Sequence, residues 1–593
     1  MIRSLVSRVL APVADAIDHF VGWHKLPRPV GILTLVGLRA RSRQLNLYDT
    51  NAARPTRDLS AEPAPRLNTR TLDGTFNDLD DPMMGGIGSR FGRNVALEHT
   101  FPEERERLLD PSPRIVSREL LTRHEFIPAE TLNVIAGAWL QFEVHDWFSH
   151  TNAEDDPWEV ELGEDDDWPR RPMHIPRTEL DPSYNEAEGP PTYITSDSHW
   201  WDGSQIYGNK EAFAASIRAG EDGKLRLDDD GMLPRDLEEN IDLSGVAGNW
   251  WVGLALLHTL FTREHNAICD RLRLEYPTWT DDQLYDRARL INAALMAKIH
   301  TVEWTPAIIA HPTTRLAMNA NWWGILGEGF RKRFGRVGSG EILSGIPGSP
   351  TDHHGVPYSL TEEFVAVYRM HPLLPDDFTF LSVKSGEVIE RREFPELGAL
   401  QARTRLEELT FPNAFYSLGI AHPGAITLHN YPRFLQHFNR PDGETIDLAA
   451  TDILRVRERG VPRYNDFRRL FRLKPAATFE EITDNPKWQK EVQRVYDNDI
   501  DRVDLMVGLY GESLPPGFGF SDTAFRVFIL MASRRLKSDR FFTTDYTPDV
   551  YTPMGLDWIG ENTMVSVLLR HFPQLAPALN GVNNAFAPWN RVG

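Results

Sequence analysis

Three polar residues whose chemistry could serve catalysis lie within one otherwise apolar stretch, residues 131–150. Gln141 and His145 are four positions apart, so on a helix their side chains share one face. A neutral histidine can accept a proton there. Asp146 points about 100° away and, once buried, needs a cation or several donors. On this stretch alone, a histidine satisfied by core packing is the commoner interpretation.

A second polar group follows in the turn-rich segment Ser196–Gly208. Ser198, Asp202 and Ser204 supply oxygen atoms at close intervals, and the intervening carbonyl groups supply more. Hard oxygen ligands on a glycine-containing turn suit Ca²⁺, although the spacing is not that of an EF-hand. The alternative is an ordinary turn, because serine, aspartate and glycine are common turn formers.

A third group lies at the end of a predicted helix, residues 360–376. Tyr368 and His371 are three positions apart, and Pro372 marks the end of the helix or a kink. A histidine there can bind a metal through one nitrogen while a partner orients the other. His145 and His371 therefore suggest the two sides of one cofactor.

These residues require helices to position them. Apolar periodicity predicts long helices over 131–150, 249–272, 280–305, 360–376 and 521–540, with Arg534 or Arg535 reaching inward from the last. Residues 151–197 and 335–358 are expected to be loops, and the acidic runs of the first are typical of a solvated surface. Strand signals are few, so the fold is predicted to be mainly α.

The N-terminal segment, residues 1–50, is amphipathic from Leu5 to Val21. One interpretation is a helical segment that lies on a membrane surface or guards a channel mouth. The other, equally favoured by the pattern, is a helix packed on the core.

Composition excludes several functions. The net charge of −21 argues against a nucleic-acid partner and against broad electrostatic binding to anionic membranes. The single cysteine, Cys269, excludes an intramolecular disulfide and any multi-cysteine metal site, and fits a reducing, cytoplasmic compartment. No stretch approaches the roughly 20 uncharged apolar residues of a spanning helix.

Taken in order, these motifs resemble those of the peroxidase–cyclooxygenase superfamily of haem proteins, and most closely the fatty-acid α-dioxygenases. The resemblance covers roughly residues 70 to 560 and rests on Trp139–Trp147, Trp200–Gly208, Glu264–Asp270, Lys298–Thr305, His371–Asp376 and Met531–Thr544. It implies a large single-domain helical haem protein, with residues 51–593 as the catalytic domain.

The resemblance also implies roles for individual residues. His371 would be the proximal ligand of a b-type haem iron, His145 the distal histidine and Gln141 its neighbour. Tyr368 would carry the radical that abstracts hydrogen. The Ca²⁺ ligands would be Asp146, Ser198, the carbonyl of Trp200, Asp202 and Ser204. The anchors of the substrate carboxylate would be His300, Thr305 and Arg535, the last chosen over Arg534 by motif alignment.

The activity implied by the resemblance is oxygenation of a long-chain fatty acid at carbon 2 by O₂, which gives a 2-hydroperoxy acid. No protein partner is expected. A rival interpretation is a haem peroxidase of the same superfamily that oxidises small donors with H₂O₂; a non-enzymatic haem sensor is a third. Tyr368, three positions before the proximal histidine, favours the oxygenase.

Overall fold

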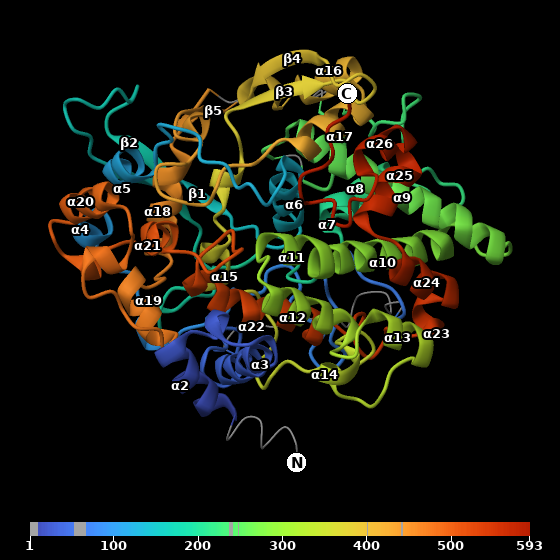
Figure 1. Cartoon of the computed structure of the whole chain (residues 1–593), viewed down its shortest axis with the longest axis horizontal. Coiled ribbons are helices and arrows are strands. Elements are labelled where there is room, and N and C mark those ends of the chain that lie inside the picture. Colours follow the sequence, from blue (N-terminus) through green and yellow to red (C-terminus); the bar gives the residue numbers. More distant parts are fainter. Residues whose placement is uncertain (1–9, 53–66, 237–240, 247, 400, 441–442) are drawn as a thin grey trace.

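The computed structural model describes residues 10–52, 67–236, 241–246, 248–399, 401–440 and 443–593, and it is mainly helical there (Figure 1). The prediction of a mainly α fold with few short strands is confirmed. The longer helices are α2 (Ala11–Val21), α3 (Arg28–Leu45), α6 (Val134–Val144), α9 (Val252–Glu275), α10 (Asp281–Ile299), α12 (Pro312–Trp323), α16 (Gln401–Leu409), α17 (Phe411–Ile420), α18 (Leu448–Glu458), α20 (Pro486–Val495), α22 (Asp522–Ser538), α24 (Pro553–Glu561) and α25 (Met564–His571).

Short helices connect these. They are α4 (Arg105–Leu108), α5 (Pro113–Val116), α7 (Ser204–Tyr207), α8 (Glu211–Ser216), α11 (Thr305–Ile308), α13 (Glu328–Phe334), α14 (Glu341–Ser344), α15 (Glu362–Val367), α19 (Tyr464–Leu470), α21 (Leu505–Gly511), α23 (Pro548–Tyr551) and α26 (Ala576–Leu579). The strands within the described residues form antiparallel pairs: β1 (Asn152–Val160) with β2 (Met173–Thr178), β3 (Asp377–Leu381) with β4 (Val388–Glu393), and β5 (Phe438–Asn439) with β6 (Thr445–Ile446).

The centre of the molecule is built from α6, α9, α10 and α17, which pack on one another. α6 is apolar on nearly every side and almost entirely buried, as expected for a helix enclosed by others. One hydrophobic core extends from Ala14 to Trp589. Helices from both ends of the sequence therefore share the same interior (Figure 1).

Local sequence signals fix where the principal helices begin. Thr280 and Gln283 form a reciprocal capping box at the start of α10, and the hydroxyl of Ser521 accepts from the backbone N–H of Ala524 in α22. The Thr361 hydroxyl caps α15 in the same way. The predicted helix over 280–305 is interrupted at His300–Trp304, where the chain forms one π-helical turn before α11.

Three expectations about local structure were wrong. Residues 335–358 are not entirely loop, because they contain α14. Residues 151–197 contain the β1–β2 hairpin, because Trp158, Val160, Met173 and Ile175 turn inward and form a small core of their own. Tyr368 and His371 also do not share a continuous helix. α15 ends at Val367, and His371 opens a separate 3₁₀ turn, since Pro372 has no N–H with which to continue the α-helical ladder.

The described part of the N-terminal segment forms α2 and α3, which pack against each other, and α3 also packs on α12 and α22. Trp23, between the two helices, is fully buried and donates to Asp522 at 2.8 Å. The residues from Leu5 to Val9 of the predicted amphipathic stretch lie outside the described residues. Among the helices that are described, none has the length and hydropathy needed to cross a membrane.

Candidate active site

A narrow pocket of about 340 Å³, including the part open to solvent, brings together four residues proposed from the sequence: Tyr368, His300, Thr305 and Arg535. They come from four separate elements, namely the end of α15, the π-helical turn, the start of α11 and α22. The other lining residues are Trp147, Trp201, Thr301, Met318, Asn321, Phe364, Ala532 and Leu536. Apart from its polar end, this is an apolar chamber.

Arg535 is a buried cation in the lining of this cavity. It is 2% exposed, no carboxylate among the described residues forms an ion pair with it, and none of its three guanidinium nitrogens makes a hydrogen bond of regular geometry there. Its polar neighbour is the neutral Tyr358 hydroxyl, whose pKa burial raises and Arg535 lowers. The Arg535 Cζ atom lies 3.9 Å from the ring centre of Trp147 and 4.6 Å from that of Trp201, so two indole faces receive the cation. A buried charge without a counter-ion is costly, which points to an anionic ligand.

The nearby carboxyl group of Glu143 does not remove this charge. Burial raises the pKa of Glu143 to about 8, while the hydrogen bond from Trp201 and the charge of Arg535 act in the opposite direction. Glu143 Oε2 accepts from the Trp201 indole N–H at 2.7 Å. At neutral pH the carboxyl group is therefore mostly protonated, and Arg535 keeps its net charge.

His300 is held as a hydrogen-bond donor toward the cavity. The indole N–H of Trp139 donates to His300 Nδ1 at 3.2 Å, and burial, helped by Arg535, lowers the pKa of the ring well below its ordinary value. The neutral imidazole must then carry its proton on Nε2. The π-helical turn positions His300, stacked on Trp304 at 4.6 Å, one turn before Thr305; such turns occur frequently at functional sites.

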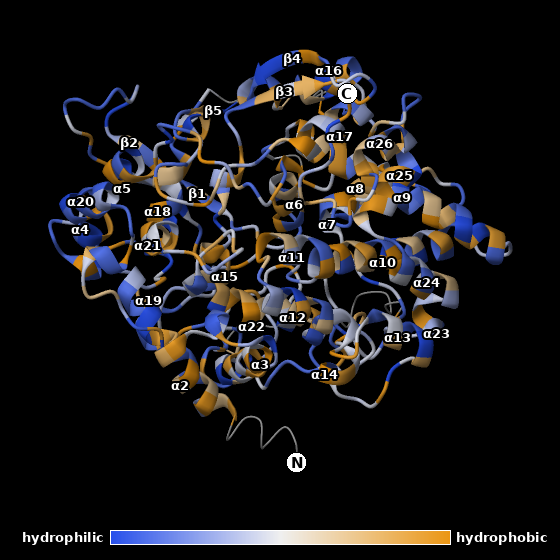
Figure 2. Ribbon diagram, viewed as in Figure 1, coloured by the Kyte–Doolittle hydropathy of each residue, from blue (hydrophilic) through white to orange (hydrophobic). Residues whose placement is uncertain are grey.

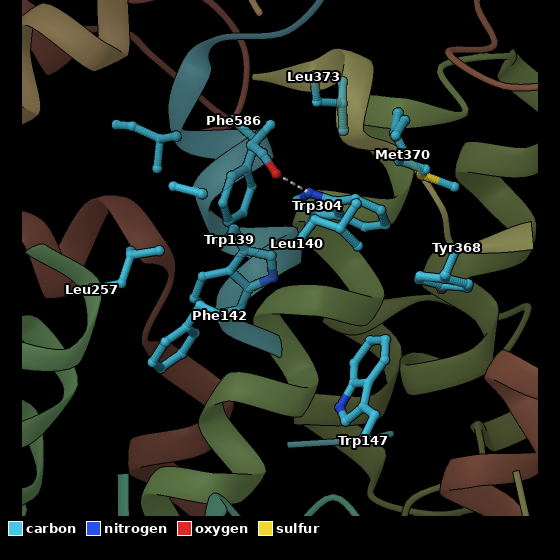
Figure 3. Close-up of a cluster of buried hydrophobic side chains, with 14 of the residues drawn as sticks. Trp139, Leu140, Phe142, Trp147, Leu257, Trp304, Tyr368, Met370, Leu373 and Phe586 are labelled. Carbon is cyan, nitrogen blue, oxygen red and sulfur yellow. Dashed lines mark hydrogen bonds between the residues drawn. The ribbon is translucent and has the colours of Figure 1, made fainter. Parts of the chain in front are cut away.

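Tyr368 faces the same chamber in an aromatic setting. Its ring centre lies 4.5 Å from that of Phe364 and 5.6 Å from that of Trp147. Figure 3 shows Trp147 and Tyr368 on the side of α6 where Trp304 packs. Burial raises the pKa of the phenol well above its ordinary value, so the hydroxyl keeps its hydrogen atom at physiological pH.

His371 has a carboxylate partner that sequence reasoning missed. Its Nδ1 lies 2.8 Å from Oδ2 of Asp452 in α18, whereas Oδ1 of the same residue pairs with Arg369 at 3.1 Å. Burial alone would raise the pKa of Asp452, but His371 and Arg369 hold it below its ordinary value. The carboxylate fixes the ring and leaves Nε2 available for a metal. No spacing rule connects positions 371 and 452.

His145 stands at the C-terminal end of α6, with its Nδ1 unpaired among the described residues. Burial lowers its pKa to about 4, so the ring is neutral and can accept a proton. Gln141 accepts from the indole N–H of Trp251 at 2.8 Å, which fixes its orientation. Both buried nitrogens of the neighbouring His258 also lack described partners, and burial, then His145, lowers its pKa.

The proposed calcium ligands converge on one buried cluster. The hydroxyl of Ser204 donates to Asp146 Oδ1 at 2.8 Å, its backbone N–H donates to both Asp146 and Asp202, and Ser198 donates to Asp202 at 2.7 Å. Oδ2 of Asp146 has no described partner. Burial first, then Asp202, raises the pKa of Asp146 well above its ordinary value.

This oxygen cluster contains two carboxylates, and its other oxygen atoms are neutral. The Trp200 carbonyl is a further candidate ligand. Among the described residues, no group of three or more Asp, Glu, His or Cys is arranged to hold a metal ion. Two adjacent buried carboxylates nevertheless repel each other unless a cation lies between them. A hard cation with oxygen ligands suits such a cluster.

Comparison with known proteins identifies the class of this fold and site. The animal haem peroxidase family model matches residues 69–583, and the chain belongs to that family. Within it the chain belongs with the α-dioxygenases. It is 38% identical to α-dioxygenase 2 of Arabidopsis thaliana, over 97% of this chain and 92% of that protein, and 36% identical to α-dioxygenase 1 of Capsicum annuum, over 99% and 92%.

Solved structures of fatty acid α-dioxygenases have the same fold as this chain. A crystal structure of Oryza sativa fatty acid α-dioxygenase, a tyrosine-to-phenylalanine variant with palmitic acid, superposes with a TM-score of 0.91 at 34% identity, over 99% of both chains. The fatty acid α-dioxygenase of Arabidopsis thaliana gives the same TM-score and identity, over 99% of this chain and 94% of that one.

The contrast between two neighbouring arginines is testable. Arg534 donates to the backbone carbonyls of Val356, Pro357 and Ser359, so Arg534→Met should lower the free energy of unfolding by about 2 kcal/mol or more. Arg535→Met should change it by less than about 1 kcal/mol, because lost cation–π contacts offset the relief of a buried charge. Denaturant titration measures both, and a larger loss for Arg535→Met would refute the unpaired-cation assignment.

Proposed function

We propose that this protein oxygenates long-chain fatty acids at carbon 2 with O₂ to give 2-hydroperoxy acids, and that Tyr368 carries the reacting radical. The observation that carries the proposal is the unpaired Arg535 cation, which shares a largely apolar pocket with Tyr368. A monocarboxylate with an apolar tail matches that chamber in charge and in polarity. The palmitic acid that accompanies the rice enzyme in its crystal structure supports this substrate class.

The anchors fix the position of the reaction. Arg535 would bind the substrate carboxylate with its planar fork, while His300 Nε2 and the Thr305 hydroxyl donate to the same oxygens. Carbon 2 is the atom next to the carboxyl carbon, so only a phenol at the anchored end can reach it. Tyr368 lies near that end, since Trp147 contacts both the Tyr368 ring and the Arg535 guanidinium.

The hydrogen atom removed from the substrate passes through Tyr368 and is returned to the product. The phenoxyl radical takes one hydrogen atom from carbon 2, and O₂ adds to the carbon radical. The resulting peroxyl radical takes the hydrogen atom back from the Tyr368 hydroxyl, which yields the hydroperoxide and restores the phenoxyl radical. The net reaction consumes one fatty acid and one O₂. The apolar walls keep water and other hydrogen donors away from the radical.

Formation of the radical requires an oxidant, and the residues fit a haem. His371 Nε2 would bind the iron while Asp452 orients the ring, and neutral His145, near Gln141, would accept a proton. When bound, haem b supplies the one-electron oxidising power that generates the tyrosyl radical. The match to the animal haem peroxidase family supports haem as the cofactor.

The acyl tail has a second apolar cavity into which it can extend. This cavity, of about 610 Å³ including the part open to solvent, is lined by α3, α12, α14 and α22 and shares Met318 and Asn321 with the anchor chamber. The tail would pass between these two side chains toward α3. We therefore place α3 of the N-terminal segment at the channel mouth and assign residues 51–593 to catalysis. A cytoplasmic location with peripheral membrane contact is part of the same proposal.

Ca²⁺ is the second proposed ligand. Asp146, Ser198, Asp202, Ser204 and the carbonyl of Trp200 would hold it. Because Asp146 directly follows His145, a cation there would fix the end of α6 and with it the position of His145.

Tyr368→Phe should abolish oxygenation of palmitate and leave the haem spectrum intact, because the ring remains but the transferable hydrogen atom is lost. Mass spectrometry of the products and the Soret band measure the two effects. If the variant still produced 2-hydroperoxypalmitate, the radical assignment would be wrong. Oxidation of small donors by H₂O₂ without any carbon-2 product in the parent protein would favour the rival peroxidase function.

Arg535→Met should reduce kcat/KM for palmitate by about two orders of magnitude, because charge-assisted hydrogen bonds contribute about 1.5–3 kcal/mol each. Arg534→Met is the control, since its side chain makes structural contacts. Steady-state O₂ uptake measures the ratio, and equal losses in the two variants would contradict the anchor.

His371→Ala should lower haem affinity and abolish activity, because the iron loses its protein ligand. Asp452→Asn should retain haem but shift the ferric/ferrous potential upward, since a neutral amide orients the ring without enriching it in electron density. Haem titration and spectroelectrochemistry test the pair. Unchanged haem affinity in His371→Ala would remove the proximal assignment.

Removal of Ca²⁺ should lower the melting temperature by several degrees, since a ligand at 100 times its Kd stabilises by about 2.7 kcal/mol. Asp202→Ala should melt lower and lose the response to added Ca²⁺. Asp197→Asn, a change outside the cluster, should keep it. A chelator that leaves the melting temperature of the parent protein unchanged would count against the site.

A further inference from the structure

Trp147 is an oxidisable ring in contact with the phenol that carries the proposed radical. Its ring centre lies 5.6 Å from that of Tyr368 (Figure 3). The other rings packed on Tyr368 in the described part of the chain are those of Phe148, Phe364 and Phe528. A phenyl ring is much harder to oxidise than a phenol, whereas an indole loses an electron about as readily. Trp147 is therefore the side chain to which a radical on Tyr368 would most easily be lost.

Loss of the radical to Trp147 would be a one-electron step. The indole gives up one electron and becomes a radical cation, while the phenoxyl radical takes that electron and becomes a phenolate. Both charges disappear only if the proton on the indole nitrogen moves to the phenolate or to another base. Since buried charges are costly, the step needs either a proton acceptor at Nε1 or surroundings that tolerate a cation on the ring.

Trp147 has no such proton acceptor among the described residues. Its side chain is 1% exposed, and its Nε1 atom makes no hydrogen bond there. It follows α6, the central helix, which is hydrophobic over most of its length (Figure 2). The indole N–H groups of Trp139, Trp201 and Trp304, by contrast, each donate to a partner. An electron lost from Trp147 would therefore leave a positive charge on the ring.

Arg535 opposes that positive charge. Its Cζ atom lies 3.9 Å from the ring centre of Trp147. A cation over the ring attracts the neutral indole but repels its radical cation, and at this distance the repulsion changes the oxidation equilibrium by on the order of a thousand-fold. Trp201 packs on Trp147 and lies 4.6 Å from the same cation. Burial raises the pKa of its N–H partner Glu143 to about 8, so that carboxyl group is a poor proton acceptor at neutral pH.

We propose that Arg535 has a second function besides anchoring the substrate: its unpaired charge confines the radical to Tyr368 by making oxidation of Trp147 and Trp201 unfavourable. The inference rests on the proposed function, because it takes Tyr368 as the site of the radical. The confinement is strongest when no fatty acid is bound, since a bound carboxylate partly neutralises the guanidinium group. The radical then has no carbon 2 to react with, and its escape would damage the protein.

Oxidation of the haem-loaded full chain by H₂O₂ without fatty acid tests the confinement. Freeze-quench EPR should show a tyrosyl radical in the parent protein. Arg535→Met should show an additional indolyl radical, identified by the narrowing of its signal in protein that contains ring-deuterated tryptophan. Peptide mass spectrometry should find at least about ten-fold more covalent oxidation of Trp147 in this variant per H₂O₂ consumed, because no cation opposes the loss of the electron.

Two further variants separate charge from packing. Arg535→Lys keeps a positive charge but loses the planar fork, so it should protect Trp147 as well as the parent does even though it anchors the carboxylate less well. The combined variant Arg535→Met and Trp147→Phe should lose most of the indolyl signal, because the ring in contact with Tyr368 can no longer be oxidised. The Soret band and denaturant titration confirm that each variant holds haem and is folded.

Confinement and oxygenation can fail independently. Equal oxidation of Trp147 in the parent and in Arg535→Met, with palmitate still oxygenated at carbon 2, would refute the confinement and leave the proposed function. A tyrosyl radical and the ten-fold difference in a parent that yields no carbon-2 product would support the confinement and refute the proposed function. Trp147 oxidised as strongly in Arg535→Lys as in Arg535→Met would assign the protection to packing and overturn the inference. A parent without any tyrosyl radical would overturn both.

Discussion

The structure depends on one unneutralised charge held in an apolar interior. Arg535 enters the chamber from α22 with indole faces as its principal neighbours, and Glu143, protonated by burial at neutral pH, leaves the cation uncompensated. Burial of this cation is unfavourable, and the rest of the fold offsets that cost. The arrangement strengthens carboxylate binding, because the electrostatic attraction is greatest where water and competing ions are absent. The chamber is thus complementary to a ligand that supplies the missing negative charge.

The chain contains 16 tryptophans, and several of them surround this charge. Trp147 and Trp201 shield Arg535, Trp139 fixes the tautomer of His300, and Trp304 supports the His300 ring. The indole N–H groups of Trp139, Trp201 and Trp304 each find a partner, at His300, Glu143 and the Ala136 carbonyl respectively. Large rings with one polar atom can therefore fill the interior and still orient polar groups.

Access to the chamber links the catalytic centre to the N-terminal segment. Met318 and Asn321 stand between the anchor chamber and the outer cavity, and α3 forms one wall of the latter. The buried pairing of Arg39 with Glu341 and Asn321 makes α3 part of the rigid framework. The same helix is thus buried on its inner side and exposed at Leu33 on its outer side.

The sequence by itself determined the helical class, the starts of α10 and α22, and the motifs that carry the family resemblance. Helical periodicity and capping are encoded within a few neighbouring residues, so they can be recognised without tertiary contacts. The β1–β2 hairpin was missed because its acidic residues conceal the inward alternation of Trp158, Val160, Met173 and Ile175. The break between Tyr368 and His371 depended on the geometry of one proline.

Only the tertiary structure decided which polar residues are partnered and which are not. Arg534 and Arg535 are identical in type and adjacent in sequence. Arg534 nevertheless donates its hydrogen bonds to backbone carbonyls, whereas Arg535 faces the chamber. The Asp452 partner of His371 and the joining of α3 to α14 bring together positions 81 and some 300 residues apart. Such pairings arise from packing between distant elements, which no local spacing records.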